Sequence, residues 1–341
     1  MNRYFVLVSG ENVTLAQAEV QALIRASGIE ASMNWSGPLA LVRCHPDPSS
    51  FILERAALTK EAGAVVFESS SFEDMMQDDC WDQIRAWIKP GDSFYIRVLN
   101  LTGVEETRSR ESAIRLLGES IRTSTGAKVA VKNPVVSILL VLEPQRVLMC
   151  ESNQSRLRSQ LRRRSPGSMP FFHPSMMNSF LARVMCNLAG VMPDHIVLDP
   201  FCGAGGILCE VSHIGAKAIG LDLSWRLLTG ARINLMSIGD ADYSLIHGDA
   251  HSIPVRGCHC VVTDPPYGRS SSTRGAEATK LVSSLLQQAS GLLSKGGSVC
   301  LCGSAEMNVL QLMTDCGFTP ELRLPVPVHS GLTREVFVLR F

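Results

Sequence analysis

The residues best suited to chemistry form the run Asp264-Pro265-Pro266-Tyr267, which directly follows an apolar stretch. Proline has a fixed φ and no N–H, so the two prolines donate no hydrogen bonds and hold their neighbours rigidly. The Asp264 carboxylate and the Pro265 carbonyl would then form two outward-facing acceptors, with the Tyr267 ring beside them. Because an amino group carries two donor hydrogens, this pair of acceptors suits an exocyclic NH₂. The run therefore predicts a site that orients an amino group, and the alternative is a structural turn.

A glycine-rich turn lies earlier in the chain, at Asp199-Pro200-Phe-Cys-Gly203-Ala-Gly205-Gly206. Its glycines allow a tight turn and let the backbone approach a ligand closely. The helix expected to follow presents free N–H groups. A nicotinamide site, a flavin site or a plain structural turn would also fit such a sequence. Asp199, ahead of the glycines, favours a ligand with a cationic or amino end over a pyrophosphate.

Two more acids occupy similar positions. Asp222 and Leu223 end an apolar stretch about twenty residues beyond Gly203, the spacing at which an acid accepts hydrogen bonds from ribose hydroxyls. The alternative for Asp222 is the N-cap of the next helix. Asp249 and Ala250 follow the next apolar stretch, where an acid could accept from an adenine amino group or simply form a turn. With the glycine-rich turn, these acids indicate a ligand that contains a nucleoside.

These signals need strands that end immediately before them, and the apolar pattern supplies such strands. Strands are predicted at residues 195–200, 218–222, 243–247, 260–263, 298–302 and 334–341. Helices are predicted at 206–213, 224–238 and 279–293. This alternation predicts an α/β fold with a mostly parallel, doubly wound sheet. Because such sheets bind ligands at the carboxyl ends of their strands, the four signals are expected at one edge.

The first 150 residues have a different pattern. Strands are predicted at 3–9, 38–44, 93–99 and 135–142, and helices at 14–26, 49–59, 81–88 and 110–123. This order indicates two small α+β units. Residues 151–170 carry several arginines together with Ser165-Pro166-Gly167, which indicates a linker.

Charge is balanced overall but segregated along the chain. Lys+Arg and Asp+Glu are both 32, so the protein is not a polycation that coats nucleic acid by charge alone. Ten acidic and four basic residues lie between positions 47 and 92, whereas thirteen basic and six acidic residues lie between 97 and 164. The basic region ends in a run of five arginines: Arg156, Arg158, Arg162, Arg163 and Arg164. Such a run can engage phosphates, or it can be a solvated linker face.

Composition excludes several classes of protein. Hydrophobic residues make up 45% and charged residues 19%, which argues against a disordered or fibrous chain. The longest apolar run covers residues 135–142, is interrupted by Ser137 and is far short of the roughly twenty residues that cross a bilayer. The start of the chain lacks a secretory apolar region. The 11 cysteines show no disulfide or metal-binding spacing, so we expect reduced thiols, no metal and a cytoplasmic location.

The motifs together resemble a known family. Residues 171–341 are similar to class I S-adenosylmethionine-dependent amino-methyltransferases with their Asp-Pro-Pro-Tyr signature. The arrangement most closely resembles the tRNA (guanine-10-N2)-methyltransferases of archaea and eukaryotes, which carry a THUMP domain. Besides residues 264–267, the matching pieces are Phe171-Phe172-His173-Pro174 and residues 329–334, where Gly331 stands in place of an expected Ser. The first 150 residues match in length and element order.

The resemblance implies a domain organisation. It assigns residues 1–50 to a ferredoxin-like domain and 51–150 to a THUMP RNA-binding domain. A basic linker at 151–170 then leads to a Rossmann-like class I methyltransferase domain at 171–341, with a seven-stranded sheet.

The resemblance also implies a cofactor, partners and site residues. The cofactor is S-adenosylmethionine and the substrate is tRNA, methylated at the N2 amine of guanosine 10. A small zinc-binding activator protein that pairs with the edge of the methyltransferase sheet is a further implied partner. The implied catalytic residues are Asp264, Pro265, Pro266 and Tyr267. The implied cofactor-binding residues are His173, Pro174, Asp199, Pro200, Gly203, Gly205, Gly206, Asp222, Leu223, Asp249, Ala250 and Asp264.

Other functions compete with this interpretation. An amino-methyltransferase could act on another guanosine of tRNA or rRNA, or on adenine N6 of DNA. DNA enzymes share the Asp-Pro-Pro-Tyr signature but need a target-recognition insertion near the catalytic domain, whereas here the extra domains precede it. A non-catalytic RNA-binding subunit would have no reason to retain Asp199, Asp222, Asp249 and Asp264. A nicotinamide oxidoreductase would give residues 264–267 no role.

Overall fold

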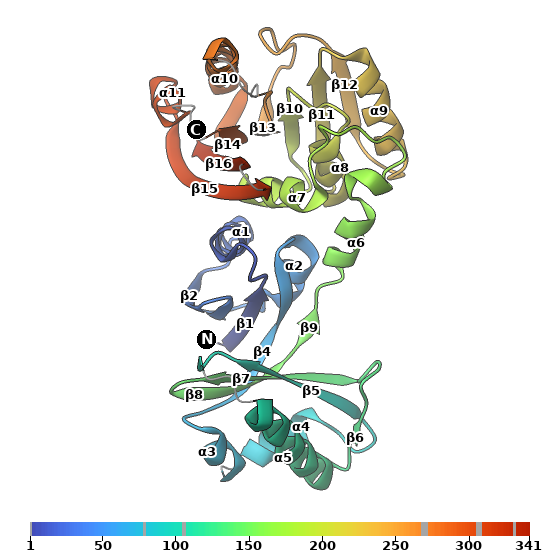
Figure 1. Ribbon diagram of the computed structural model, residues 1–341, viewed down its shortest axis with the longest axis vertical. Helices are drawn as coiled ribbons and strands as arrows, with labels where there is room; N and C mark the ends of the chain where they lie inside the picture. Colours follow the sequence, from blue (N-terminus) through green and yellow to red (C-terminus); the bar gives the residue numbers. More distant parts are fainter. Residues whose placement is uncertain (1, 78–79, 104–106, 267–271, 305–308, 330–331) are drawn as a thin grey trace. The chain divides into compact units, whose positions relative to one another are not determined.

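The computed structural model describes residues 2–77, 80–103, 107–266, 272–304, 309–329 and 332–341 (Figure 1). Contacts divide the chain into two compact units, each drawn from separated stretches of sequence. The first unit comprises Met1–Val8, Ile29–Leu53 and Thr59–Ser155. The second comprises Ser9–Gly28, Glu54–Leu58 and Arg156–Phe341.

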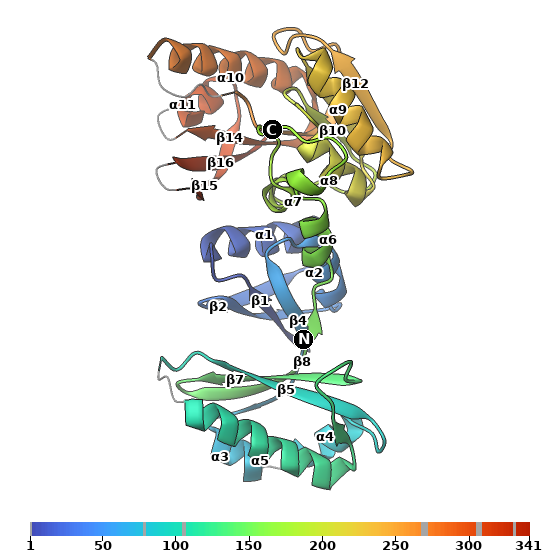
Figure 2. The same cartoon turned by 45° about the vertical axis from the view of Figure 1, so that its right-hand side comes forward.

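The first unit is built on one large sheet. Over the described residues it has nine strands in the order β2-β3-β1-β4-β8-β7-β5-β6, with β9 beside β4. The strands are β1 (Asn2–Val8), β2 (Ala31–Ser36), β3 (Leu39–Cys44), β4 (Thr59–Ser69), β5 (Ser93–Asn100), β6 (Lys128–Val129), β7 (Val136–Glu143), β8 (Arg146–Glu151) and β9 (Asn153–Gln154). Its helices include α2 (Ser49–Arg55), α3 (Phe72–Gln77), α4 (Cys80–Trp87) and α5 (Thr107–Thr125). Figure 2 shows α3, α4 and α5 on one side of β5 and β7.

Helix α5 shows how the sequence pattern produces this layer. Ala113, Leu117 and Ile121 recur at four-residue spacing and are buried. This spacing places them on one face of the helix, where they pack with Phe94 and Ile138 in a single core cluster. Most of the described side chains between them are exposed, so α5 covers the sheet with its apolar face only.

The second unit holds the predicted doubly wound sheet. Over the described residues it has seven strands in the order β12-β11-β10-β13-β14-β16-β15. They are β10 (Ile196–Asp199), β11 (Lys217–Asp222), β12 (Tyr243–His247), β13 (Cys258–Thr263), β14 (Leu293–Ser304), β15 (Thr319–His329) and β16 (Leu332–Arg340). The strands from β12 to β14 are parallel, whereas β16 runs antiparallel to both of its neighbours. The predicted fold class is therefore confirmed.

Helices cover both faces of this second sheet. They are α1 (Val13–Ala26), α6 (Leu157–Arg163), α7 (Ser179–Leu188), α8 (Gly206–Ile214), α9 (Trp225–Met236), α10 (Ser272–Leu292) and α11 (Val309–Asp315). Alternation along β13 separates the two layers: Cys260 and Val262 belong to the core beneath α7 and α8, and Val261 to the core beneath α10 and α11. Because β13 is buried on both faces, it is an almost continuous apolar run.

Helix α1 belongs to the second unit although it lies near the start of the chain. Its buried residues Leu15, Ala18 and Ala22 share a core cluster with Met185 and Leu188 of α7. Apolar spacing predicts this helix correctly, but the spacing carries no information about its partner.

Several strands are absent from the sequence prediction, namely β2, β4, β6, β8, β9 and β15. The predicted helix at 49–59 is too long, because α2 ends at Arg55 and β4 begins at Thr59. Strand β15 contains Pro320, Pro325 and Pro327, which break the usual strand pattern. Because β15 lies at the edge of the sheet, its outward N–H groups need no partner and proline is tolerated there.

The stretch that the sequence suggests as a linker contains regular structure. Residues 151–170 include β9, helix α6 and a 3-10 turn at Pro166–Ser168. Leu157 and Leu161 are 5% and 0% exposed and join the core of the second unit. Their four-residue spacing gives α6 one apolar face among its arginines. Over the described residues, no helix combines the length and the apolar character that a membrane span requires.

Candidate active site

Parallel strands bring the predicted acids to one edge of the second sheet. Asp199 is the last residue of β10 and Asp222 the last residue of β11, while Asp264 directly follows β13. Strand β13 pairs with β10, which in turn pairs with β11. The carboxyl ends of these three adjacent strands therefore carry the acids, as the sequence predicts. We call Asp199, Asp222 and Asp264 the acidic edge.

Asp199 is the most buried acid of this edge, with 1% of its surface exposed. Its Oδ1 accepts hydrogen bonds from the Thr263 hydroxyl at 2.6 Å and from the Phe201 N–H at 3.2 Å. Burial, reinforced by the nearby carboxylates of Asp264 and Asp222, raises the pKa of Asp199 to about 7. The Thr263 bond also ties the end of β13 to the end of β10.

The glycine-rich turn is fixed to Asp222. Gly203 and Gly205 have φ angles of +52° and +83°, which side chains other than glycine rarely adopt. The Gly203 N–H donates to Asp222 Oδ2 at 2.8 Å, and the Ser224 N–H donates to Oδ1 at 2.8 Å. Ser224 caps α9 by accepting from the Leu227 N–H, so Asp222 is not the N-cap. Each carboxylate oxygen has a second lone pair, which leaves Asp222 able to accept from ribose hydroxyls.

Asp249, the acid predicted after the strand at residues 243–247, lies in a more open position. Asp249 has 53% of its side chain exposed and accepts from the N–H and ring nitrogen of His251 at 2.9 and 2.8 Å. These hydrogen bonds lower the pKa of Asp249. Ala250 is buried, and its carbonyl accepts from the Gln288 amide at 2.8 Å. Leu223 is 67% exposed beside Asp222 and presents an apolar surface at the same edge.

The segment predicted to orient an amino group starts at the end of β13. Asp264 is half-buried, and its Oδ2 lies 3.1 Å from Nη1 of Arg334 on β16. Pro265 is buried and Pro266 is exposed. Tyr267 lies outside the described residues, as does Gly331 of the 329–334 stretch. Arg334 belongs to that stretch, and the sequence alone does not indicate that it pairs with Asp264.

The segment 171–174 is attached to α9 through its first residue. The backbone N–H and carbonyl of Phe171 both bond to the side chain of Asn234. His173 Nδ1 lies 2.7 Å from the Ser175 hydroxyl, and Pro174 is exposed. Sequence reasoning did not single out Asn234, because one polar residue on a helix has no distinguishing pattern.

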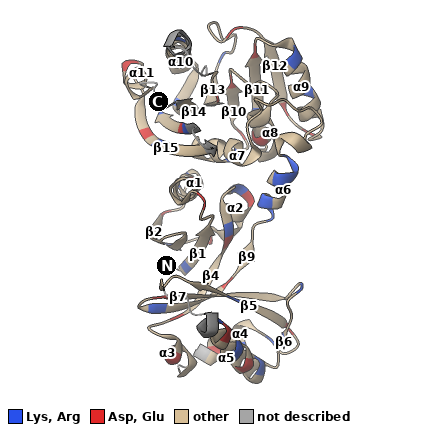
Figure 3. Cartoon of the chain, in the orientation of Figure 1, with Lys and Arg blue, Asp and Glu red and all other residues tan. Residues whose placement is uncertain are grey.

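The arginine run divides between solvent and protein. Arg156, Arg162 and Arg163 are exposed, and much of the α6 ribbon has the blue of Lys and Arg in Figure 3. By contrast, Arg158 donates to the Ala57 carbonyl at 3.1 Å, and its guanidinium lies 5.5 Å from the centre of the Phe180 ring. Arg164 turns inward toward Glu210. The run is therefore not one continuous basic face.

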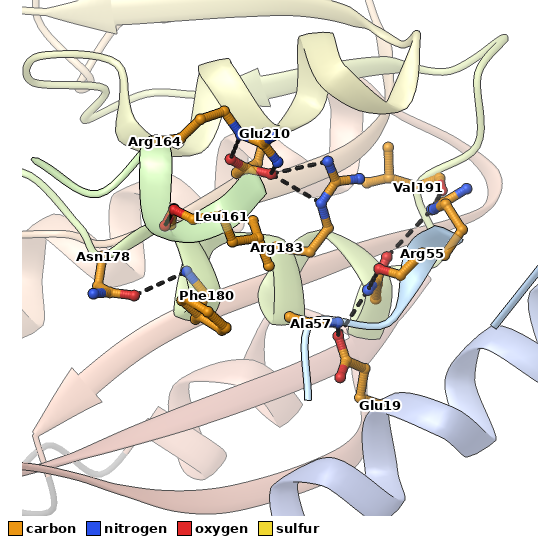
Figure 4. Close-up of polar contacts among 12 residues, drawn as sticks. Glu19, Arg55, Ala57, Leu161, Arg164, Asn178, Phe180, Arg183, Val191 and Glu210 are labelled. Carbon is orange, nitrogen blue, oxygen red and sulfur yellow. Dashed lines mark hydrogen bonds and ion pairs between the residues drawn. The ribbon is translucent and has the colours of Figure 1, made fainter. Parts of the chain in front are cut away.

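Arg164 belongs to a buried ion cluster at helix α8. Its Nε and Nη2 donate to the two oxygens of Glu210 at 2.8 and 3.0 Å. Arg183, on α7, donates to Glu210 from the other side at 2.9 Å (Figure 4). Glu210 and Arg183 are 1% and 3% exposed as side chains. We call Arg164, Arg183 and Glu210 the arginine clamp, and it holds α8, the helix that begins at the glycine-rich turn.

The strand order, the glycine-rich turn after β10 and the acids after β10 and β11 define a class I methyltransferase. S-adenosylmethionine is the methyl donor of this class, and the residues at the site fit it. Asp199 offers a carboxylate to a cationic group, and Asp222 retains acceptor capacity for a ribose. Leu223, next to Asp222, presents an exposed apolar surface of the kind that an adenine ring packs against.

Comparison with known proteins defines the family. A family model described as an RMKL-like methyltransferase domain matches residues 166–334. The chain is 33% identical over 337 residues to the tRNA (guanine(10)-N2)-dimethyltransferase of Methanothermobacter thermautotrophicus, covering 98% of each protein. It is 28% identical over 309 residues to the enzyme of that name from Methanocaldococcus jannaschii, covering 82% of this chain and 86% of the relative. The crystal structure of TrmN from Thermus thermophilus matches 99% of each chain with a TM-score of 0.58 and 18% identity.

The chain therefore belongs to the tRNA (guanine-10-N2)-methyltransferase family, and the resemblance inferred from its motifs is confirmed.

Proposed function

We propose that this protein transfers methyl groups from S-adenosylmethionine to the exocyclic N2 amine of guanosine 10 in tRNA. The observation that carries this proposal is the convergence of Asp199, Asp222 and the 264–266 segment at one sheet edge. The two archaeal relatives compared above are both named tRNA (guanine(10)-N2)-dimethyltransferase. We accordingly expect both N2-methylguanosine and N2,N2-dimethylguanosine as products.

The residues of the edge supply the positioning that the reaction needs. Bound S-adenosylmethionine supplies an electrophilic methyl group. The guanine N2 amine is a poor nucleophile because its lone pair is delocalised into the ring. The Asp264 carboxylate and the Pro265 carbonyl accept its two hydrogens, which turns the nitrogen toward sp³ geometry and makes its lone pair available. Asp264 then takes the proton that the amine releases, directly or through water.

Tyr267, next in sequence, is proposed to stack on the target base. The target guanine amine lies inside a tRNA stem, so the nucleotide must leave the stack at a cost of about a few kcal/mol. Contacts elsewhere on the tRNA must offset that cost. We assign this role to the exposed Arg156, Arg162 and Arg163 and to a THUMP domain at residues 51–150, which follows a ferredoxin-like domain at 1–50. Arg158 and Arg164 contribute by holding α6 in place.

A zinc-binding activator protein is proposed to bind at the free edge of the second sheet. Strand β12 is the edge strand at that end. Beside it, Trp225 and Met236 of α9 are 69% and 61% exposed. An open strand edge flanked by exposed apolar side chains suits pairing with another protein. We further propose a cytoplasmic location, where buried thiols such as Cys300 and Cys302 stay reduced.

The test is methyl transfer from labelled S-adenosylmethionine to an unmodified tRNA transcript, with nucleoside analysis of the product. A matched transcript carries another base at position 10, and both are assayed with and without the candidate activator. Label in N2-methylguanosine or N2,N2-dimethylguanosine that disappears with the base change supports the proposal. Label on guanosine that survives the change moves the target to another nucleotide. Transfer only to DNA adenine would replace the proposed substrate altogether.

A further inference from the structure

Asn234 contacts two segments of the proposed cofactor site, the 171–174 segment and the glycine-rich turn. The residue is fully buried, and its Oδ1 accepts from the Phe171 N–H at 2.9 Å. Its Nδ2 lies 3.0 Å from the Phe171 carbonyl and 3.0 Å from the Ala204 carbonyl. Because the amide nitrogen has two hydrogens, both carbonyls can be satisfied at once. One side chain therefore joins the start of the 171–174 segment to the glycine-rich turn.

Gly230, one helical turn before Asn234, provides a second and independent contact with the same segment. A Cβ atom at Gly230 would lie 2.2 Å from Cδ1 and 2.3 Å from Cε1 of Phe171. The Phe171 ring thus packs directly on the backbone of α9, and only glycine leaves room for it. Ala231 follows Gly230 on the same helix, and a Cβ atom at Gly205 would lie 3.1 Å from the Cβ atom of Ala231. A single face of α9 contacts both proposed ligand-binding segments.

The far end of the segment is also confined. A Cβ at Gly206, the first residue of α8, would lie 3.1 Å from the Met177 carbonyl and 3.3 Å from Met176 Cγ. The Met176 N–H donates to the His173 carbonyl at 2.9 Å and closes a turn. The stretch that contains His173 is therefore held by α9 on one side and by the start of α8 on the other.

We infer that Gly230 and Asn234 are positioning residues for S-adenosylmethionine, which set the distance between the 171–174 segment and the glycine-rich turn. This inference rests on the proposed function of that site. Neither residue touches the reacting atoms, so both act through the backbone that they hold. The sequence segment Gly-Ala-Arg-Ile-Asn at 230–234 thus belongs to the cofactor site although it lies outside the motifs that identify it.

The first test removes the amide and compares it with a matched residue. Asn187 is also fully buried, and its Nδ2 bonds to Glu19 and to the Arg55 carbonyl at 2.8 Å, away from the acidic edge. Binding of S-adenosylhomocysteine to the full chain is measured by calorimetry for Asn234→Ala and Asn187→Ala, together with thermal unfolding. We expect both variants to unfold at lower temperature, while only Asn234→Ala weakens binding, by about tenfold or more. Equal binding by both variants would overturn the inference.

The second test uses the space at Gly230 and does not depend on the stability of the Asn234 variant. Gly230→Ala is expected to weaken S-adenosylhomocysteine binding about tenfold in the native background, because the new methyl displaces the Phe171 ring. In a Phe171→Ala background the same substitution should change nothing. Gly291→Ala on α10, where a Cβ meets open space, is the matched control.

The outcomes distinguish a failure of the positioning role from a failure of the proposed function. An equal effect of Gly230→Ala in both backgrounds, or no effect in the native one, would overturn the positioning role. Failure of the unmodified protein to bind S-adenosylhomocysteine would instead overturn the proposed function. Affinity for tRNA serves as a further readout, and the positioning role predicts that Gly230→Ala leaves it unchanged.

Discussion

Asp199 and Glu210 are two acids of the second unit with the same exposure, 1% each, and opposite surroundings. Glu210 accepts hydrogen bonds from two guanidinium groups, those of Arg164 and Arg183. Asp199 receives a hydroxyl and a backbone N–H and has two carboxylates as neighbours. Among the described residues, no cation lies within ion-pair distance of Asp199. Glu210 is therefore paired with cations within the protein, whereas Asp199 is not; of the acidic edge, Asp264 has a cation of its own, Arg334.

This difference separates structure from function. A buried carboxylate without a cation costs free energy, so its persistence needs a reason. A cationic ligand supplies one, because it would compensate Asp199 only when bound. In the arginine clamp, Glu210 already has its cations within the protein. Because Glu210 lies on α8, the clamp holds the helix that begins at the glycine-rich turn. Each prediction below alters one side of this comparison.

The largest effect is expected for Asp264→Ala. Without the carboxylate, the guanine amine loses one of its two acceptors and its proton acceptor, so turnover should fall by about 10³-fold. Binding of S-adenosylhomocysteine should persist, since Asp199 and Asp222 remain. Single-turnover methyl transfer and calorimetry measure the two quantities separately. A variant with full turnover would refute the role of Asp264.

Glu210→Ala should damage stability instead of chemistry. The buried guanidinium group of Arg183 and the largely buried one of Arg164 would lose their counter-ion, and the free energy of unfolding should drop by about 3–5 kcal/mol. Denaturant unfolding followed by circular dichroism measures this loss. Glu119→Ala is the matched control, because Glu119 pairs with Arg122 on an exposed face of α5 and should cost nothing measurable. Equal stability of the two variants would remove the distinction between clamp and edge.

The acidic edge was accessible to sequence reasoning and the clamp was not. Strand ends can be predicted from apolar runs, and parallel pairing then places Asp199, Asp222 and Asp264 together without further information. The sequence alone does not distinguish the five arginines before the methyltransferase domain from one another. Burial of Leu157 and Leu161 decides which of them turn inward, and the partner Glu210 lies 46 residues beyond Arg164.

The same limit explains the other residues that sequence reasoning missed. Helix α1 was predicted from its periodicity, but its packing against α7 joins residues such as Glu19 and Asn187, which are 168 positions apart. Asn234 bonds to a residue 63 positions earlier in the chain. Contacts of this range depend on the completed fold, whereas local spacing reports only the element in which a residue lies.

The pH dependence of cofactor affinity tests the role of Asp199, the buried acid of the comparison that has no cation. With the pKa of Asp199 at about 7, a cationic ligand that needs the ionised form must displace a proton at lower pH. Affinity for S-adenosylmethionine should therefore fall below pH 7, by nearly tenfold per unit. Asp199→Asn should bind weakly and without this dependence. Titration calorimetry at pH 5.5 and pH 8 measures the affinity of the native protein for S-adenosylmethionine. Equal affinities at the two pH values would contradict the role of Asp199.

Stability should change in the opposite direction for the protein without ligand. The ordinary pKa of this carboxyl is 3.8, so the unfolded chain releases the proton near pH 4 while the folded chain keeps it until about pH 7. Within that window the folded state binds more protons, and the contribution of Asp199 to the free energy of unfolding decreases as pH rises. Asp199→Asn should therefore be more stable than the native protein at pH 8, with a smaller gain at pH 5.

The smallest effects are expected on the exposed arginines of α6. Arg162→Ala and Arg163→Ala should each weaken tRNA binding a few-fold and reduce the slope of log affinity against log salt by about 0.7–0.9. The reason is that each contact with a phosphate releases about one condensed counterion. Filter binding across a salt series measures the slope, and Arg256→Ala, an exposed arginine outside the run, is the control. Slopes that match the control would confine RNA contacts to other parts of the chain, because α6 would then serve only to carry Arg164 to the clamp.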